Sequence, residues 1–195
     1  MNGPDQPSTP LPSGSGADHT VRLAWPDDAE AIAALQRRAW TEDWATGPGA
    51  VLSDLDAVFG DLAEHAARWR QTLTHSPEAR FRVLVAQTSA AVAGYAVVHP
   101  AGDPDADPVR DGEIGDLAVE PALRRDGHGT RLVQAAVDTA AADGFALLRA
   151  WVGSRDDATR TLLTGGGWAA DGAHRELEAP DGERIRQVRL HTQIA

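Results

Sequence analysis

The chain of 195 residues contains no cysteine and no lysine. Without cysteine, a disulfide framework, a zinc–thiolate site and a cysteine nucleophile are all excluded. All 18 basic residues are arginine, and 29 residues are acidic, which gives a formal net charge of -11. This charge excludes a uniformly basic nucleic-acid footprint, although it leaves a local basic patch open. The lack of lysine also excludes a Walker phosphate loop.

Long apolar runs are missing as well. No run approaches the ~20 residues that a membrane-spanning helix needs, so we expect no membrane span. The N-terminus has no basic region followed by an apolar run, so no secretory signal is predicted and a cytoplasmic location is expected. The excess of Ala, Arg, Asp and Gly in a chain without Lys is typical of a GC-rich bacterial genome.

The chain is predicted to form one domain after a short tail. Residues 1–18 are rich in Pro, Ser and Gly, and Leu11 is their only aliphatic anchor. Such a segment cannot bury enough apolar surface to offset the entropy of ordering it, so we expect a disordered tail. Residues 19–195 are long enough for a single domain with a full core.

The periodicity of the apolar residues predicts a strand, two helices, three strands, a helix, a strand, a short helix and two final strands. The strands are expected at 21–25, 81–87, 91–99, 113–119, 146–152, 173–177 and 185–190. The first helix is expected to start with Asp27 as its N-cap and Glu30 three residues on. The other helices are expected at 54–74 (with Ser53 as N-cap), 130–143 and 156–164. This order predicts a mixed sheet with helices packed on its faces.

The segment from Val119 to Leu132 joins the end of a strand to the start of a helix through a polar loop. Gly127 and Gly129 allow the backbone to turn so that successive N–H groups face one point. The unpaired N–H groups and the dipole of the helix start favour an anion, such as a diphosphate, at the same point. Arg124 could add a charge-assisted contact. An ordinary strand-to-helix turn explains the glycines alone equally well, and Leu132 breaks the G-x-G-x-x-G dinucleotide fingerprint.

The same stretch resembles the acetyl-coenzyme A (acetyl-CoA) motif of the GCN5-related N-acetyltransferase (GNAT) family. The family pattern Gln/Arg-x-x-Gly-x-Gly/Ala appears here as Arg124-Arg125-Asp126-Gly127-His128-Gly129, with Val119-x-Pro121 before it and Leu132 after it. The order of the predicted elements also matches, from about Thr20 to the C-terminus. The resemblance implies an α/β (α+β) fold with a mixed, mostly antiparallel sheet of six or seven strands and helices on both faces. The fourth and fifth strands would splay apart, with acetyl-CoA in the gap.

The resemblance implies a role for each residue of the motif. Backbone groups of Leu117, Ala118 and Val119 would hold the pantetheine arm, and an N–H near Leu117 would polarise the thioester carbonyl. The pyrophosphate would be held by Arg124 and by the backbone N–H groups of Arg125, Asp126, Gly127, His128, Gly129 and Thr130. Asp156 aligns with an Asn that often contacts the cofactor. Many members have Gly in place of Arg125 and a basic residue in place of Asp126, so the Asp126 carboxylate would have to point away from the phosphates. No metal is implied.

Glu113 is the leading candidate for the general base, acting directly or through a water. The incoming amine must lose a proton, and Glu113 lies eleven residues before Arg124, where several family members carry their catalytic Glu. A solvated residue at the end of the acidic 100–112 loop is an equally weighted alternative. Strand alternation places Asp116 on the opposite face, which makes it a weaker candidate. The position of the family's proton-donating Tyr is occupied by Leu163, so the usual acid is absent.

The expected reaction is direct transfer of the acetyl group to a primary amine of a small molecule. Six acids in the region of the first two helices could attract a cationic amine: Glu42, Asp43, Asp54, Asp56, Asp61 and Glu64. A solvated helix face with acids in the first turn explains them as well. Two alternatives stay open: a catalytically weak acyl-CoA sensor of the same fold, and acetylation of protein N-terminal or side-chain amines. A homodimer is expected from the family, and nucleic-acid or membrane partners are not.

Overall fold

The computed structural model describes residues 20–45, 55–89, 91–178 and 184–194. Within these ranges, seven strands form one sheet in the order β1-β2-β3-β4-β5-β7-β6. All neighbouring strands are antiparallel except β4 and β5, which are parallel. The strands are β1 (Thr20–Leu23), β2 (Arg82–Gln87), β3 (Val92–Pro100), β4 (Asp111–Val119), β5 (Leu147–Gly153), β6 (Ala169–Glu178) and β7 (Arg184–Gln193). The predicted mixed, mostly antiparallel sheet is confirmed.

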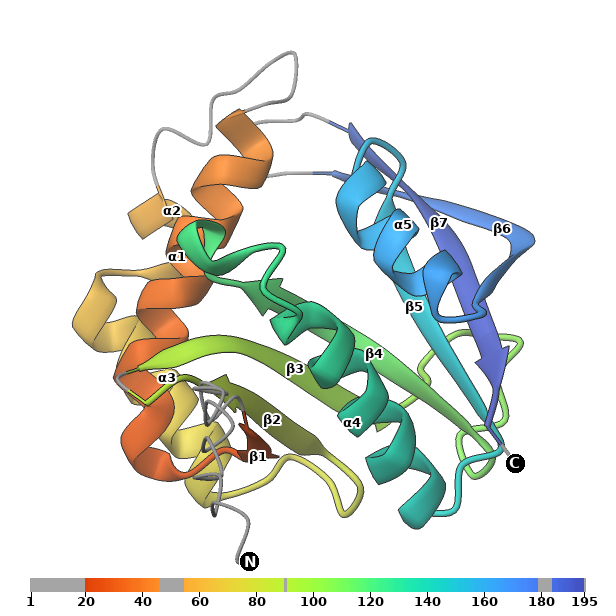
Figure 1. The fold of residues 1–195 in the computed structure, drawn as a ribbon, viewed down its shortest axis with the longest axis horizontal. Coiled ribbons are helices and arrows are strands. Elements are labelled where there is room, and N and C mark those ends of the chain that lie inside the picture. The colour runs from red at the N-terminus through yellow and green to blue at the C-terminus, as the bar shows by residue number, and fades with distance from the viewer. Residues whose placement is uncertain (1–19, 46–54, 90, 179–183, 195) are drawn as a thin grey trace, which may run out of the picture.

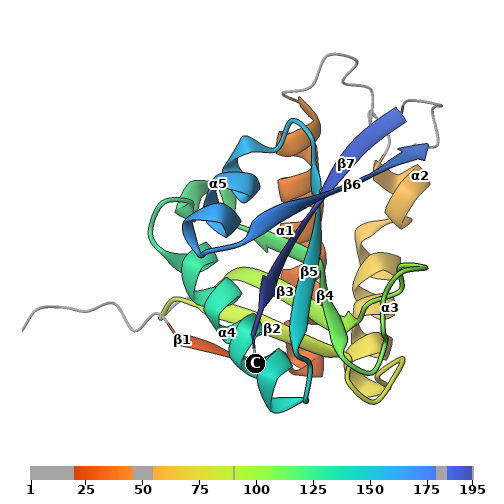
Figure 2. The ribbon, with the colours of Figure 1, turned by 90° about the vertical axis from the view of Figure 1, so that its right-hand side faces the viewer.

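Helices cover both faces of this sheet, as predicted (Figure 1). The helices are α1 (Ala29–Ala45), α2 (Leu55–Phe59), α3 (Leu62–Thr74), α4 (His128–Ala142) and α5 (Asp157–Gly165). The edge-on view in Figure 2 shows α4 and α5 on one side of the strands and α3 on the other. Single 3-10 turns precede α1 and α4, at Pro26–Asp28 and Pro121–Leu123. None of the helices in the described ranges has the length and apolarity that crossing a membrane requires.

Each face of the sheet has its own apolar core. On the α4 face, Leu132 of α4 and Leu148 of β5 are fully buried in one cluster. On the other face, Ile32 and Leu35 of α1 pack with Tyr95 of β3 in a second cluster. Burying a side chain of this size stabilises the fold by roughly 1.5–3 kcal/mol. The two cores therefore fix α1 and α4 on opposite sides of the central strands.

Two helix boundaries differ from the sequence prediction. The single helix expected at 54–74 is divided at Gly60, whose left-handed backbone (φ 65°) interrupts the ladder. α3 then starts afresh with Asp61 as its N-cap, which accepts a hydrogen bond from Glu64 N at 2.8 Å. Asp27 is not the N-cap of the first helical segment, because Trp25 occupies that position and the Asp28 carboxylate accepts from its N–H. The predicted tail and the predicted N-cap Ser53 lie outside the described residues.

The parallel pairing of β4 and β5 is short. It runs from Asp111 with Leu147 to Ile114 with Ala150 and goes no further. Beyond this point β4 continues beside β3 and β5 continues beside β7. Figure 1 shows the two strands separating toward their C-terminal ends. This is the predicted splay of the fourth and fifth strands, and it divides the sheet into two parts joined by four residue pairs.

The close approach of β3 to β4 requires glycine at position 94. A Cβ at Gly94 would lie 2.8 Å from the carbonyl oxygen of Ala118 and 2.9 Å from Cδ1 of Leu132. We expect Gly94→Ala to lower the free energy of unfolding by roughly 1–3 kcal/mol, because backbone and core must shift to make room. Gly102→Ala is the control, since a Cβ there meets nothing within 4 Å. Urea denaturation of both variants tests this, and equal stabilities would contradict the close approach.

Candidate active site

The loop between β4 and α4 has the backbone shape of an anion-binding nest. Arg125 and Gly127 both adopt the left-handed conformation, with φ of 75° and 83°. Residues of this kind turn successive N–H groups toward one point. Helix α4 starts at His128, and Arg131 N bonds with Gly127 O at 3.2 Å. The segment predicted to bind an anion, which ends at Thr130, therefore combines a nest with a helix N-terminus, and the binding itself stays a prediction.

Arg125 explains one departure from the family pattern. It is the only residue other than glycine with a positive φ in the described part of the chain. A left-handed backbone costs an ordinary L-residue about 1–2 kcal/mol, whereas glycine adopts it freely. The Gly that many members carry here is therefore the residue that the loop geometry favours. Arg125 keeps the same geometry at some cost in stability.

Side chains around the nest have structural contacts of their own. Arg124 Nε lies 3.4 Å from the carbonyl oxygen of Val119, at the end of β4. A Cβ at Gly129 would lie 3.0 Å from Cδ2 of Leu162, so glycine lets α5 approach the start of α4. Asp156 is the N-cap of α5 and accepts from Thr159 N at 2.9 Å. A cofactor contact of Asp156 stays a prediction.

Past Ile114, the edge of β4 that faces β5 has no paired strand within the described ranges. Leu117, Ala118 and Val119 pair with β3 but lie past the last residue that pairs with β5, Ile114. Backbone N–H and C=O groups need hydrogen-bond partners, and an extended ligand can supply them as a strand would. The resemblance implies that these three residues hold the pantetheine arm, and that contact stays a prediction.

A β-bulge at Gly115 decides which residues of β4 face α1 and α3. Two consecutive residues of β3 are paired with Asp116 and Ile114, so Gly115 is an extra residue on β4. Ile114 belongs to the core on the α4 face, while Asp116 bonds with Tyr95 on the other face. The prediction that Asp116 and Glu113 lie on opposite faces is wrong. It assumed unbroken alternation, and the bulge places both residues on the α1–α3 face.

Asp116 is the end of a chain of buried polar contacts. Its Oδ2 accepts hydrogen bonds from Tyr95 Oη at 2.5 Å and from Gln36 Nε2 at 2.6 Å. Gln36 Oε1 accepts in turn from His65 Nε2 at 2.9 Å and from Trp69 Nε1 at 3.0 Å. Since indole N–H only donates, these contacts fix the orientation of the Gln36 amide. Burial raises the pKa of Asp116, and the bonds from Tyr95 and Gln36 oppose that rise. We call these five residues the Asp116 network.

Glu113 lies on the same face and is 8% exposed. Its burial contradicts the alternative of a solvated residue at the end of the acidic loop. Burial raises the pKa of the Glu113 carboxyl; the charge of His99 lowers it, that of Asp103 raises it and that of Arg175 lowers it. A carboxyl group with a raised pKa beside a gap in the sheet is suited to exchanging a proton.

The acidic loop of residues 101–110 is fixed over β5 and β7 by ion pairs. Arg149 and Arg189, whose side chains are each 9% exposed, are its partners. The contacts are Arg149 Nη1 to Asp105 (3.1 Å), Arg149 Nη2 to Asp111 (2.7 Å), Arg189 Nη1 to Asp103 (3.0 Å) and Asp105 (2.7 Å), and Arg189 Nε to Asp171 (2.7 Å). Trp151 Nε1 also donates to Asp103 at 3.1 Å. These acids are therefore neutralised locally.

The acids predicted to attract a cation from the first helices have structural roles where they are described. Asp56 forms an ion pair with Arg37. Asp61 and Glu64 form the capping box of α3. The side chains of Glu42, Asp43 and Asp54 lie outside the described residues. The structural explanation is thus favoured for Asp56, Asp61 and Glu64.

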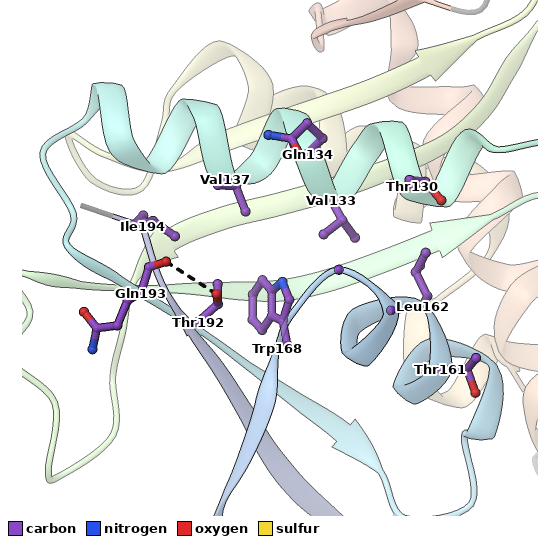
Figure 3. Close-up of a pocket in the computed structure, with 12 residues that line it drawn as sticks. Thr130, Val133, Gln134, Val137, Thr161, Leu162, Trp168, Thr192, Gln193 and Ile194 are labelled. Atoms are coloured by element: carbon purple, nitrogen blue, oxygen red, sulfur yellow. Dashed lines mark hydrogen bonds between the residues drawn. The ribbon is translucent and has the colours of Figure 1, made fainter.

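A cavity of about 490 Å³ lies on the α4–α5 side of the sheet (Figure 3). Val133 and Val137 of α4 face Trp168 across it, and Leu162 of α5 lies at the side. Thr130 is the one residue of the predicted site that lines it. The cavity extends away from the nest along α4, on the opposite face from Glu113 and Asp116.

Several residues beside the gap were not found from the sequence. Tyr95, Gln36 and His99 come from elements far from the motif, and only the fold brings them to β4. One signal was available, because a glycine inside a predicted strand, here Gly115, often marks a bulge. Leu163, at the position of the family's Tyr, is 1% exposed in the core and offers no proton.

The chain is similar to known proteins in two ways: it matches a family model, and solved structures share its fold. The model of the acetyltransferase (GNAT) family matches residues 29–163. No curated protein matches the chain. Among solved structures, yncA from Salmonella typhimurium with its cofactor acetyl-CoA shares 20% identity over 92% of this chain and 95% of that chain (TM-score 0.67). An N-acetyltransferase from Staphylococcus aureus Mu50 shares 14% identity over 92% of this chain and 100% of that chain (TM-score 0.68). A ribosomal-protein-alanine N-acetyltransferase from Brucella melitensis shares 19% identity over 89% of this chain and 99% of that chain (TM-score 0.67). At these identities the likeness shows the fold.

The neutral His65 of the Asp116 network makes the stability of the fold depend on pH. Burial, then the charges of Arg68 and Arg37, lower the pKa of His65 from 6.5 to about 4. Between these values the unfolded chain binds a proton that the folded chain does not, so stability falls as the pH falls. The loss approaches roughly 3 kcal/mol at pH 4, at about 1.4 kcal/mol per pKa unit. His65→Gln keeps a donor for Gln36 without titrating, so its urea-unfolding free energy should fall less between pH 7 and 4. An equal fall of the unfolding free energy in the wild type and in His65→Gln would contradict this.

Proposed function

Because the chain belongs to the acetyltransferase (GNAT) family, we propose that it moves an acetyl group from acetyl-CoA directly to the primary amine of a small molecule. The observation that carries this proposal is the arrangement where the pairing of β4 and β5 ends. The nest and the start of α4 lie on one face of the sheet, and Glu113 and Asp116 lie on the other. A donor and an amine can therefore approach the same gap from opposite faces.

The residues on the α4 side fit acetyl-CoA. The left-handed residues Arg125 and Gly127 and the first turn of α4 provide N–H groups for a pyrophosphate. The edge of β4 from Leu117 to Val119 provides strand-like partners for a pantetheine arm. When bound, acetyl-CoA supplies a thioester that an amine attacks. The N–H near Leu117 would polarise its carbonyl group as an oxyanion donor.

The residues on the α1–α3 side fit an amine. A primary amine arrives as an ammonium ion at neutral pH and must lose a proton before it attacks. Glu113 and Asp116 place two carboxyl groups beside the gap, and negative charge there favours a cation. Glu113 helps the proton to leave, either directly or through another group. The attraction for a cationic acceptor comes from these two residues rather than from the acids of α2 and α3.

A second candidate is a module that binds acetyl-CoA without catalysis. The observation that favours it is Leu163, which is buried where many family members have a proton-donating Tyr. Protein amines are the other acceptor class, since one structurally similar protein is a ribosomal-protein-alanine N-acetyltransferase. Thiol release measured over small amines and N-terminal peptides separates these possibilities.

Calorimetry with acetyl-CoA tests the nest. A Cβ at Gly127 would lie 3.0 Å from Arg131 Nη1, and its φ of 83° strains any other residue. We expect Gly127→Ala to weaken acetyl-CoA binding about tenfold, or about 1.4 kcal/mol. Gly144→Ala is the matched control, because Gly144 has φ of 85° at the other end of α4 and open space around it. If wild-type protein binds no acetyl-CoA, both the transferase and the sensor are ruled out.

Glu113→Gln tests the acceptor side. The amide retains the shape of the carboxyl group but neither takes a proton nor carries a charge. We expect turnover at neutral pH to fall on the order of 100-fold, with acetyl-CoA affinity near that of the wild type. Glu30→Gln, on the exposed start of α1, is the control. Kinetics that stay unchanged across pH would remove Glu113 from the mechanism.

A further inference from the structure

The imidazole ring of His99 on β3 has a defined tautomer. Its Nδ1 lies 2.8 Å from the carbonyl oxygen of Pro100. A carbonyl oxygen only accepts, so Nδ1 carries the hydrogen and the neutral ring has its free lone pair on Nε2. Phe81 lies nearly parallel to the ring, with centroids 6.1 Å apart and planes at 13°. The side chain is thus held as a base with Nε2 as the basic atom.

Nε2 of His99 is directed at the bulge of β4. A Cβ added at Gly115 would lie 2.2 Å from Nε2 and 2.9 Å from Cδ2 of His99. The imidazole edge therefore fills the space that a side chain at position 115 would need. Gly115 is exposed although β4 is the central strand of the sheet. Nε2 has no hydrogen-bond partner among the described residues, and Gly115, which it faces, is the first residue of β4 past the last pair with β5.

Glu113 lies directly opposite His99 in the β3–β4 register. Side chains of directly opposed residues lie on one face, with Cβ atoms about 4.5–5.5 Å apart. A carboxylate at this separation stabilises a protonated imidazole, and the reciprocal effect is the lowering of the Glu113 pKa by His99. Asp103 adds negative charge around this pair, whereas Arg175 adds positive charge. The pair is therefore arranged to accept one proton on the imidazole.

We propose that His99 takes the proton from the ammonium group of the acceptor, and that Glu113 stabilises the imidazolium ion that results. The N–H bond of the ammonium ion breaks, its electron pair stays on the amine nitrogen, and Nε2 receives the proton. The positive charge moves from substrate to imidazole, and the proton then passes to water. The neutral amine is the nucleophile for the thioester. This assignment rests on the proposed N-acetyltransferase function.

The tautomer is tested without any reaction. Long-range ¹H–¹⁵N correlation spectra of the full chain, with no ligand added, report which ring nitrogen of each histidine carries hydrogen. His99→Asn identifies the His99 signals by their loss. We expect hydrogen on Nδ1 and a free Nε2 at neutral pH. Hydrogen on Nε2 in the neutral ring would overturn the proposal, because that nitrogen could not then accept a proton.

The proton transfer is tested by kinetics with an amine that the wild-type protein acetylates. His99→Asn places an amide near the Pro100 carbonyl but provides no base, so we expect turnover to fall on the order of 100-fold. Affinity for acetyl-CoA, measured by calorimetry, should not change. Imidazole added to His99→Ala should restore part of the turnover. His75→Asn, at the exposed end of α3, is the matched control.

Gly115→Ala is a second variant that keeps the imidazole but displaces it. Its Cβ would lie 2.2 Å from Nε2, so the ring must move aside and turnover should fall although His99 is still present. Full turnover in either His99→Asn or Gly115→Ala, with an active wild type, would overturn the role of His99 alone. A wild-type protein that acetylates no amine would overturn the proposed function, and the proton transfer with it.

Discussion

The termination of the β4–β5 pairing after Ile114 and Ala150 is the constraint on which the rest of the molecule depends. Up to that pair, hydrogen bonds hold the two halves of the sheet together. After it, among the described strands, β4 is paired only with β3 and β5 only with β7. The edge of β4 toward β5 therefore has backbone N–H and C=O groups that no described strand pairs with. The nest at Arg125 to Gly127 follows the same strand and lies at the start of α4. A single interruption in the sheet thus supplies both the gap and the backbone that lines it.

The net charge of -11 has little direct influence at this gap. Asp103, Asp105 and Asp111 form ion pairs with Arg149 and Arg189, which fix the 101–110 loop across β5 and β7. Arginine suits this task because its planar fork contacts several carboxylates at once. Asp103 and Asp111 are largely buried, and their pairs with buried arginines offset part of the cost of removing these carboxylates from water, whereas Asp105 is exposed. The charge that an incoming amine meets is therefore set by a few local groups, and the surplus of acids elsewhere contributes mainly at longer range.

Local features of the sequence predicted much of the fold and the turned backbone between β4 and α4, while the roles of the site residues stay predictions. The strand–loop–helix motif from Val119 to Leu132 predicted a turned loop before a helix, although the left-handed residues are Arg125 and Gly127 rather than Gly127 and Gly129. The α1–α3 side could not be predicted in the same way. Gln36, Tyr95 and His99 reach β4 only through tertiary packing, and no spacing connects them to Glu113. A one-residue bulge moved Asp116 to the other face, since alternation fails wherever a strand has an extra residue. The homodimer, the cytoplasmic location and the acceptor stay predictions.

The bulge also links the two halves of the site. An extra residue in β4 turns Asp116 toward the α1–α3 face. After it the strand alternates again, so that Leu117 and Val119 pack against the core on the α4 face and Ala118 against the core on the other face. Glycine at this position leaves room for the His99 ring, because a Cβ there would lie 2.2 Å from Nε2 and the ring would have to move. The bulge in β4, the glycine at position 115 and the position of the His99 ring therefore depend on one another. Removing the bulge would restore strict alternation in β4 and turn the Asp116 side chain away from Tyr95. Nε2 of His99 would then face a regularly paired strand without the extra residue Gly115.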